Sequence, residues 1–320
     1  MALHVIVGKG PVGTTTAELL AARGHRVRVL SRSGGTSTDT AEHRRVDATD
    51  AAALTRAAAG AAALYNAVNP EYHRWATDWP PVAAALLTAA ERTGAVLVTT
   101  SNLYVYGRPT GPMTPESPLA ATDTKGRVRV AMWRDALAAH ETGRIRMTEA
   151  RAGDFVGPQV PPAHSHLVRQ LDTLRRGRRA WVVGDPDAPR SWSYLPDVAA
   201  TLAALGTDER ALGRAWHVPS SPPRSQRQAL AELAAAMGRP PVPVSGLPWA
   251  VLSAIGLVAP RMREIVDVRH QFDQEYVLDA TATTQTFGLA ATPWPEVLAA
   301  TAGAPVAART PEVSRAGRRR

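Results

Sequence analysis

Three glycines at the end of the first apolar segment form the most specific chemical motif of the sequence. They lie in Gly8-Lys9-Gly10-Pro11-Val12-Gly13, a G-x-G-x-x-G pattern. Glycines at this spacing let the chain turn tightly, bring backbone amides against a pyrophosphate, and allow a helix to pack closely on a strand. A helix that begins at Pro11 would also direct amide donors and its positive dipole end at phosphates. The motif predicts a dinucleotide site formed by Gly8, Gly10, Pro11, Val12 and Gly13.

The end of the next strand-forming segment indicates which dinucleotide binds. A site specific for NAD usually places Asp or Glu there, against the ribose hydroxyls. This chain has Ser31-Arg32-Ser33 instead. An arginine with neighbouring hydroxyls suits a 2′-phosphate, although Arg32 is also compatible with a plain surface position. We therefore expect Ser31 and Arg32 to bind NADP(H), with NAD(H) as the less favoured cofactor.

Alternating strands and helices must position these residues. Short apolar or β-branched runs predict strands at 3–7, 26–30, around Val46, at 62–67, 95–99 and 145–151. Helical periodicity and capping residues predict helices at 11–23, 50–59, 80–93 and 125–141. Strand–helix alternation with short connections predicts an α/β fold with a Rossmann-type, doubly wound parallel sheet.

The pattern changes after residue 158. We expect helices at 164–176, 197–205 and 226–237, a strand at 180–183, and a proline cluster at 240–248. These elements predict a dinucleotide-binding domain over residues 1–160 and a smaller C-terminal substrate-binding region over 161–304, some of whose strands rejoin the main sheet. The Pro- and Arg-rich stretch 305–320 lacks periodicity and predicts a disordered basic tail.

Composition excludes several classes of site. The chain has no cysteine, which removes disulfides, thiolate metal sites and cysteine nucleophiles, and its histidines show no metal-ligand spacing. The net charge of +9 comes from scattered arginines without an aromatic reader motif, so we expect no nucleic-acid partner. Without a signal peptide or a membrane-spanning stretch, we expect a cytoplasmic protein with a small-molecule substrate, no membrane partner and a possible homodimer.

Several later segments resemble the extended short-chain dehydrogenase/reductases, the NAD-dependent epimerase/dehydratase family. The resemblance runs over about residues 3 to 303. It is carried by Thr99 to Gly107 (TTSNLYVYG), Pro115 to Pro118 (PESP), Arg151 to Pro158 (RAGDFVGP), Arg190 to Val198 (RSWSYLPDV), and Asp279 with the later FGL.

The resemblance implies further contacts. Asp47 and Ala48 would contact the adenine, and Asn66 and Asn69 would follow the fourth strand along the cofactor. Asp154 and Phe155 would lie beside the substrate. Arg190 would meet an anionic group of the substrate, as its family counterpart does, or else form a surface salt bridge.

The family's catalytic residues are replaced in this chain. Its Tyr-x-x-x-Lys motif cannot occur, because the only lysines are Lys9 and Lys125. Alignment of Lys125-Gly126-Arg127-Val128-Arg129 on the family pattern puts Lys125 at the tyrosine and Arg129 at the lysine, and Asn102 falls at the serine. Arg129 would then bind the nicotinamide ribose. Lys125, if desolvated beside Arg129, would serve as acid or base, unless it is an exposed lysine at a helix start. Tyr104 is the alternative proton donor, unless it is a packed loop residue.

Three functions fit these residues. The leading one is an NADP(H)-dependent oxidoreductase that reduces a small organic molecule with a non-standard proton donor. The second is a catalytically silent NADP(H)-binding protein that senses redox state or regulates a partner. The third is a nucleotide-sugar epimerase or dehydratase, which would need the missing tyrosine–lysine base.

Overall fold

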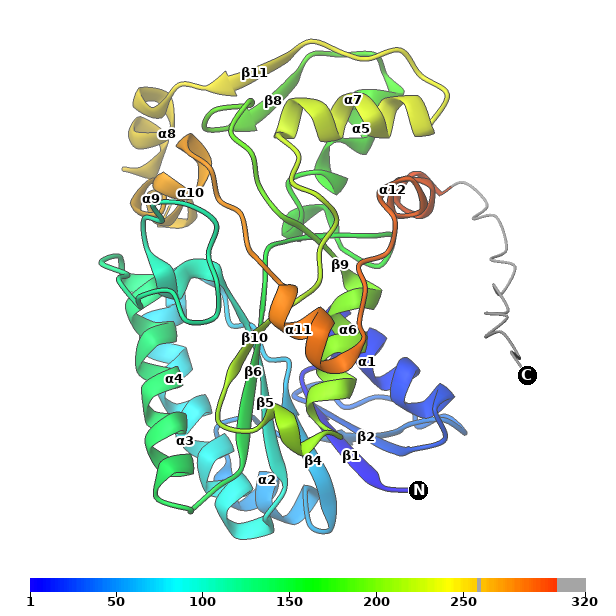
Figure 1. The fold of residues 1–320 in the computed structure, drawn as a ribbon, viewed down its shortest axis with the longest axis vertical. Helices are drawn as coiled ribbons and strands as arrows, with labels where there is room; N and C mark the ends of the chain where they lie inside the picture. The colour runs from blue at the N-terminus through cyan, green and yellow to red at the C-terminus, as the bar shows by residue number, and fades with distance from the viewer. Residues whose placement is uncertain (258–259, 304–320) are drawn as a thin grey trace, which may run out of the picture.

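A seven-stranded parallel sheet forms the centre of the computed structural model, which describes residues 1–257 and 260–303 (Figure 1). The strand order is β10-β6-β5-β4-β1-β2-β3. In chain order the strands are β1 (Leu3–Val7), β2 (Arg26–Ser31), β3 (Glu42–Arg45), β4 (Ala61–Asn66), β5 (Val96–Asn102), β6 (Met147–Ala152) and β10 (Ala215–His217). The order reverses between β1 and β4, and open α/β sheets bind ligands at the carboxyl edge of such a point. The predicted doubly wound Rossmann-type sheet is confirmed.

Helices cover both faces of the sheet, and each face has its own apolar core. Along β1, Val5 and Val7 contribute to the core on one face and Ile6 to the core on the other, and all three are buried. This is why strands of a doubly covered sheet read as continuous apolar runs. The first core packs against α2 (Ala51–Ala57), α3 (Trp75–Thr93) and α4 (Thr124–Glu141), and the second against α1 (Pro11–Ala22) and α6 (Leu195–Leu205).

A smaller region, called the upper region below, stands over the carboxyl edge of the sheet (Figure 1). It contains two parallel strand pairs, β7 (Asp154–Val156) with β9 (Trp192–Tyr194) and β8 (Ala180–Val183) with β11 (Val244–Leu247). Its α-helices are α5 (Leu171–Arg175), α7 (Gln226–Ala236), α8 (Trp249–Gly256), α9 (Pro260–Asp267), α10 (His270–Asp273) and α12 (Trp294–Ala302). Between these elements, β10 joins the main sheet, and α6 and α11 (Thr281–Phe287) pack against it. The boundary near residue 160 stays a prediction, and the tail at 305–320 lies outside the described residues.

Two predicted helices have different limits in the structure. The predicted helix at 164–176 is broken into short turns, η3 (Pro162–His164) and η4 (Val168–Gln170), followed by α5. The break comes from Ser165, whose backbone is extended and whose hydroxyl accepts hydrogen bonds from the amides of Leu167 and Val168 at 3.3 and 3.1 Å. Helix α3 begins at Trp75, after the turn η1 (Tyr72–Arg74), and not at the Pro80 that suggested its start.

Strand β5 extends three residues past the predicted end at Thr99. Its residues Thr100 to Asn102 pair with Ala150 to Ala152 of β6. The extension carries polar side chains to the carboxyl edge of the sheet, where the short helix η2 (Leu103–Tyr106) follows. Among the described residues, no helix is long and apolar enough to cross a membrane, and no three acidic or histidine side chains cluster as metal ligands.

Candidate active site

The turn after β1 has a backbone that only glycine adopts easily. Gly8 has φ of +114°, and its amide donates a hydrogen bond to the Leu30 carbonyl at 2.9 Å. A Cβ at Gly8 would lie 2.4 Å from the carbonyl oxygen of Ala67 in the loop after β4. The turn is therefore held between β2 and β4 at the point where the strand order reverses.

The other two glycines of the motif differ in how closely they are packed. A Cβ at Gly13 would lie 2.0 Å from the carbonyl oxygen of Gly8, so the first turn of α1 packs directly on the loop. Gly10 is the N-cap of α1, and a Cβ there would meet nothing within 4 Å. Pro11 occupies the first helical position, and the half-buried Val12 packs against the core under α1. The helix N-terminus is thus open at Gly10, where a pyrophosphate would approach its amides.

Basic and hydroxyl side chains surround the end of β2. The Ser31 hydroxyl donates to the Gly34 carbonyl at 3.1 Å, and the same oxygen accepts from the Lys9 ammonium at 3.0 Å. Arg32 is exposed beside them. Lys9 of the glycine motif therefore reaches the loop that follows Arg32, a contact that sequence reasoning missed.

Asp47 and Ala48 follow β3 at the same edge. The Asp47 carboxylate accepts hydrogen bonds from the amide and the hydroxyl of Thr49 at 2.9 and 2.8 Å. These bonds lower the pKa of Asp47. Ala48 is partly buried against the core. The predicted adenine contacts of both residues stay predictions.

Asn66 ends β4 with an unsatisfied amide. Its side chain is buried, and its Oδ1 accepts from the Val68 amide at 3.2 Å. Its Nδ2 is buried and has no hydrogen-bond partner among the described residues. A buried donor left without a partner is the kind of group that a bound ligand satisfies. Asn69 is exposed in the loop beyond.

Lys125 is buried and not an exposed lysine at a helix start. Its side chain is 2% exposed, and its ammonium forms an ion pair with Glu264 of α9. The same ammonium lies 4.1 Å from the centroid of the Tyr72 ring. Figure 1 shows α9 above the N-terminal end of α4, so this pair joins the upper region to the main sheet domain.

Arg129 is buried one turn further along α4. Its guanidinium lies 4.6 Å from the Trp75 ring and 4.4 Å from the Trp79 ring, both on α3. Its Nη1 donates to the Thr100 carbonyl at 3.4 Å, and its Nε has no partner among the described residues. Burial lowers the pKa of Arg129 to about 10. Its contact with a nicotinamide ribose stays a prediction.

Tyr104 lies on η2, just beyond the carboxyl end of β5. Its hydroxyl accepts a hydrogen bond from the Tyr72 hydroxyl at 3.2 Å, and Asn102 holds its amide through Oδ1 at 3.2 Å. Burial raises the pKa of Tyr104 to about 12, although the Tyr72 hydrogen bond and the charges of Arg190 and Arg129 act in the opposite direction. The phenol is therefore neutral at neutral pH.

The substrate residues predicted by resemblance occupy two different places. Asp154 of β7 forms an ion pair with Arg190, with 2.5 Å between Oδ2 and Nε. Arg190 is 3% exposed, and its guanidinium lies 5.0 Å from the Phe272 ring. Phe155 is only partly buried and packs against the core under α1 and α6.

The structure brings Tyr104, Asp154, Arg190 and Arg129 into one electrostatic neighbourhood at the carboxyl edge of the sheet. Sequence reasoning missed Tyr72, which donates a hydrogen bond to Tyr104, and Glu264, which pairs with Lys125. Tyr72 lies in the segment after β4, the strand that the resemblance aligns with the cofactor, which is a usable signal. Glu264 is 139 residues from Lys125 and carries no local motif.

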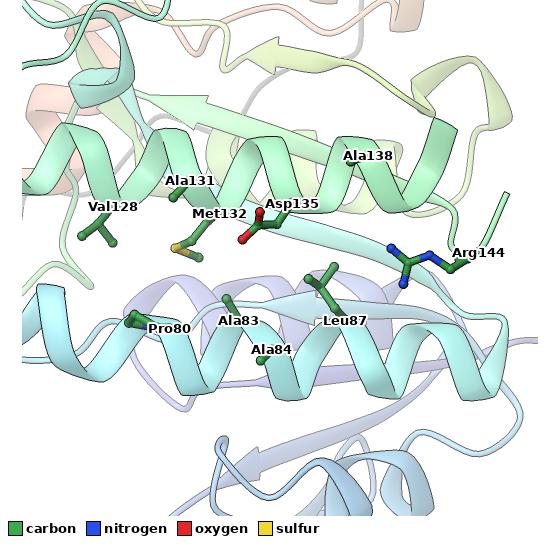
Figure 2. Close-up of a pocket in the computed structure, with 10 residues that line it drawn as sticks. All are labelled: Pro80, Ala83, Ala84, Leu87, Val128, Ala131, Met132, Asp135, Ala138 and Arg144. Carbon is green, nitrogen blue, oxygen red and sulfur yellow. The ribbon is translucent and has the colours of Figure 1, made fainter. Parts of the chain in front are cut away.

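A groove of about 430 Å³ lies between α3 and α4, and its side chains are mostly apolar (Figure 2). Figure 2 shows Met132 and Asp135 of α4 directed toward α3, and Leu87 of α3 directed toward α4. Lys125 and Arg129 are buried elsewhere on α4, and no predicted site residue lines the groove. Whether this chain forms a homodimer stays a prediction.

Comparisons with known proteins agree with this architecture. A family model described as the NAD dependent epimerase/dehydratase family matches residues 5–218. No curated protein matches the chain by sequence.

Solved structures share the fold at low sequence identity. A dTDP-glucose 4,6-dehydratase from Bacillus anthracis in complex with NAD has a TM-score of 0.77 at 14% identity, covering 95% of this chain and 96% of its own. A UDP-glucose 4-epimerase from Thermotoga maritima with UDP-glucose has a TM-score of 0.76 at 17% identity, covering 94% and 97%. A putative epimerase from Burkholderia cenocepacia has a TM-score of 0.74 at 22% identity, covering 94% and 97%.

Proposed function

The chain belongs to the NAD-dependent epimerase/dehydratase family, and from this premise we propose that it is an NADP(H)-dependent reductase of a small organic carbonyl or related compound. The observation that carries the proposal is Tyr104. It is a neutral, buried phenol beyond the carboxyl end of β5, and it accepts a hydrogen bond from Tyr72. In open α/β sheets this edge is where the reacting end of a dinucleotide lies.

The residues of the glycine loop suit a dinucleotide. Gly10 is the N-cap of α1, and the space beside it is open. The Nδ2 of Asn66, which has no partner among the described residues, offers a donor further along the same edge. We propose NADP(H) as the cofactor because Arg32 and Lys9 supply two cations at the end of β2, where no acidic side chain follows Ser31. NAD is the competing cofactor, since the similar dehydratase is described as an NAD complex.

When bound at the glycine loop, a reduced nicotinamide would supply a hydride to the carbonyl carbon of the substrate. As the C–H bond forms, the carbonyl π electrons move to oxygen, which must then take a proton. Tyr104 is the proposed donor of that proton. Because Tyr72 donates to Tyr104, the proton of Tyr104 remains available for the substrate oxygen. A phenol whose pKa is about 12 is still a stronger acid than the alcohol product of the reduction, so proton transfer from Tyr104 to the substrate alkoxide is favourable in free energy.

Three neighbours stabilise the phenolate left after donation. The Tyr72 hydrogen bond and the charges of Arg190 and Arg129 all lower the pKa of Tyr104, against the dominant effect of burial. Arg129 thus takes over electrostatically the task that the family assigns to its motif lysine. Lys125 is a positioning residue in this scheme, because its ion pair with Glu264 holds α9 over Tyr72.

A nucleotide-sugar epimerase or dehydratase is the second candidate, and the similar solved structures favour it. Two observations argue against it. Those reactions require a base, and a phenol with a raised pKa is a poor one at neutral pH. Arg190, which the resemblance assigned to an anionic substrate group, is already paired with Asp154.

The test is a panel of uncharged aldehydes, ketones and enones incubated with NADPH. The expected result is substrate-dependent loss of the 340 nm absorbance, with a reduced product detected by mass spectrometry. Tyr104→Phe should lower kcat about 100-fold or more and leave the NADPH affinity almost unchanged. Tyr194→Phe is the matched control, because Tyr194 ends β9 and the charges that act on it are those of Asp197 and Glu296, not those around Tyr104.

The alternatives give different outcomes. Conversion of UDP-glucose or dTDP-glucose without net NADPH consumption would favour the epimerase or dehydratase. Tight NADPH binding without turnover of the carbonyl compounds or of the nucleotide sugars would favour the silent sensor.

A further inference from the structure

A third tyrosine, Tyr276, packs in the same core cluster as Leu103 and Val105, the two chain neighbours of Tyr104. Tyr276 lies in the segment between α10 and α11, which runs from the upper region back to the sheet (Figure 1). Its amide donates to the Pro189 carbonyl at 2.9 Å, and its carbonyl accepts from the Ser191 amide at 3.2 Å. These bonds fix the backbone of Tyr276 alongside Arg190.

The hydroxyl of Tyr276 is buried and unsatisfied. The residue is 5% exposed, and its ring packs in a core cluster with Leu103 and Val105. The hydroxyl oxygen has no hydrogen-bond partner among the described residues. Burial of a hydroxyl without a partner costs free energy, and most native proteins avoid it. A phenol at this position therefore calls for a ligand, since phenylalanine would fill the same space without that cost.

The surroundings of the hydroxyl belong to the candidate active site. Tyr276 and Tyr104 interact electrostatically with each other, and both interact with Asp154 and Arg190. Asp123 also acts on Tyr276, and its buried Oδ2 likewise lacks a partner in the described part of the chain. The Tyr276 hydroxyl, a donor, and the Asp123 Oδ2, an acceptor, thus lie in one electrostatic neighbourhood, and both lack partners among the described residues.

We propose that the Tyr276 hydroxyl is a second hydrogen-bond donor to the substrate oxygen that Tyr104 protonates. This assignment rests on the proposed reductase function and deepens it. Hydride addition places negative charge on that oxygen, and a preorganised donor in a water-excluded site stabilises such charge. Tyr276 would bind the oxygen throughout, whereas Tyr104 transfers its proton.

The same cluster indicates an uncharged substrate. The Arg190 cation is paired with Asp154, and the Lys125 cation is paired with Glu264. An anionic substrate would have to displace one of these carboxylates from a largely buried cation. An uncharged carbonyl compound needs no such exchange.

The first experiment measures the melting temperature of Tyr276→Phe without ligand. Because the hydroxyl has no partner in the described part of the chain, the variant should melt at the wild-type temperature or above, as the control Tyr194→Phe should. A drop of several degrees in Tyr276→Phe alone would show a structural partner for the hydroxyl and overturn the proposal.

The second experiment measures binding without turnover, by titrating uncharged ketones, with cyclohexanone and acetophenone as the first probes, into the protein saturated with NADP⁺. Loss of one neutral hydrogen bond predicts about a threefold to tenfold weaker Kd in Tyr276→Phe, with no change in Tyr194→Phe. Equal affinity in wild type and Tyr276→Phe, or no binding of any ketone to the wild type, would overturn the assignment.

Kinetics separate this proposal from the reductase function. If ketones bind and depend on Tyr276 but are not reduced by NADPH, the reductase function fails and the Tyr276 site stands. If a ketone is reduced and Tyr276→Phe has the wild-type kcat/KM, the reductase stands and Tyr276 has no part in it. The expected result is a kcat/KM at least tenfold lower in Tyr276→Phe.

Discussion

Replacement of Gly10 and of Gly13 by alanine should weaken cofactor binding in both cases but should lower stability by different amounts. A Cβ at Gly13 would lie 2.0 Å from the Gly8 carbonyl oxygen, so α1 or the loop must move by about 1 Å or more to accept it. Overpacking of this kind costs about 1–3 kcal/mol, and backbone on both sides of the contact favours the upper end. For a chain of this size that is a drop in Tm of roughly 3–5 °C.

Gly10→Ala introduces no such contact, because nothing lies within 4 Å of the new methyl group. Alanine is a poorer N-cap than glycine, so a loss of at most about 1 kcal/mol is expected. The methyl group would, however, stand between the N-terminus of α1 and the pyrophosphate. We therefore expect at least tenfold weaker NADPH binding in Gly10→Ala at nearly wild-type stability.

Differential scanning fluorimetry and titration calorimetry measure the two quantities on the same samples. Gly111→Ala is the control, since its new Cβ also meets nothing within 4 Å and it lies outside the glycine loop. Normal NADPH affinity in Gly10→Ala would refute the placement of the pyrophosphate at the open end of α1. A Gly13→Ala protein as stable as wild type would refute the packing argument.

Three further predictions follow from single side chains. Arg32→Ala should weaken NADPH binding about tenfold and leave NADH binding unchanged by calorimetry, and equal losses for both cofactors would contradict a 2′-phosphate contact. Lys125→Met should spare NADPH affinity but lower both kcat and Tm, because Glu264 loses its partner; normal turnover would remove Lys125 from the site. Burial lowers the pKa of His217 to about 4 from 6.5, so its unfolded form takes up a proton first as the pH falls. That histidine alone should then make unfolding in urea about 2 kcal/mol easier at pH 5 than at pH 7, and an unchanged unfolding free energy would contradict its buried, neutral state.

The local sequence was sufficient to predict the main sheet and the tight turn at the glycine motif. Its strands are buried on both faces and so read as apolar runs, and the close contacts at Gly8 and Gly13 explain why the motif needs glycine there. The prediction of one helix at 164–176 was wrong, because the Ser165 hydroxyl accepts hydrogen bonds from nearby amides and interrupts the periodic segment. Such a competition between side chain and helix leaves little trace in apolar spacing.

The surroundings of the residues proposed for catalysis were only half predictable. Tyr104 and Lys125 stand near motif positions and were singled out for that reason, but their partners come from distant elements. Glu264 of α9 pairs with Lys125 of α4, and Tyr276 lies in the segment before α11. Neither carries a local pattern, since only the packing of the upper region over the sheet brings Glu264 to Lys125 and Tyr276 to the neighbourhood of Tyr104.

A crystal structure of the protein with NADPH tests the central claim most directly. The account predicts the pyrophosphate at Gly10, the 2′-phosphate beside Arg32 and Lys9, and the nicotinamide C4 facing a space that the hydroxyl of Tyr104 reaches. A nicotinamide ring bound away from Tyr104, with no proton donor within hydrogen-bond reach of the space above C4, would contradict it.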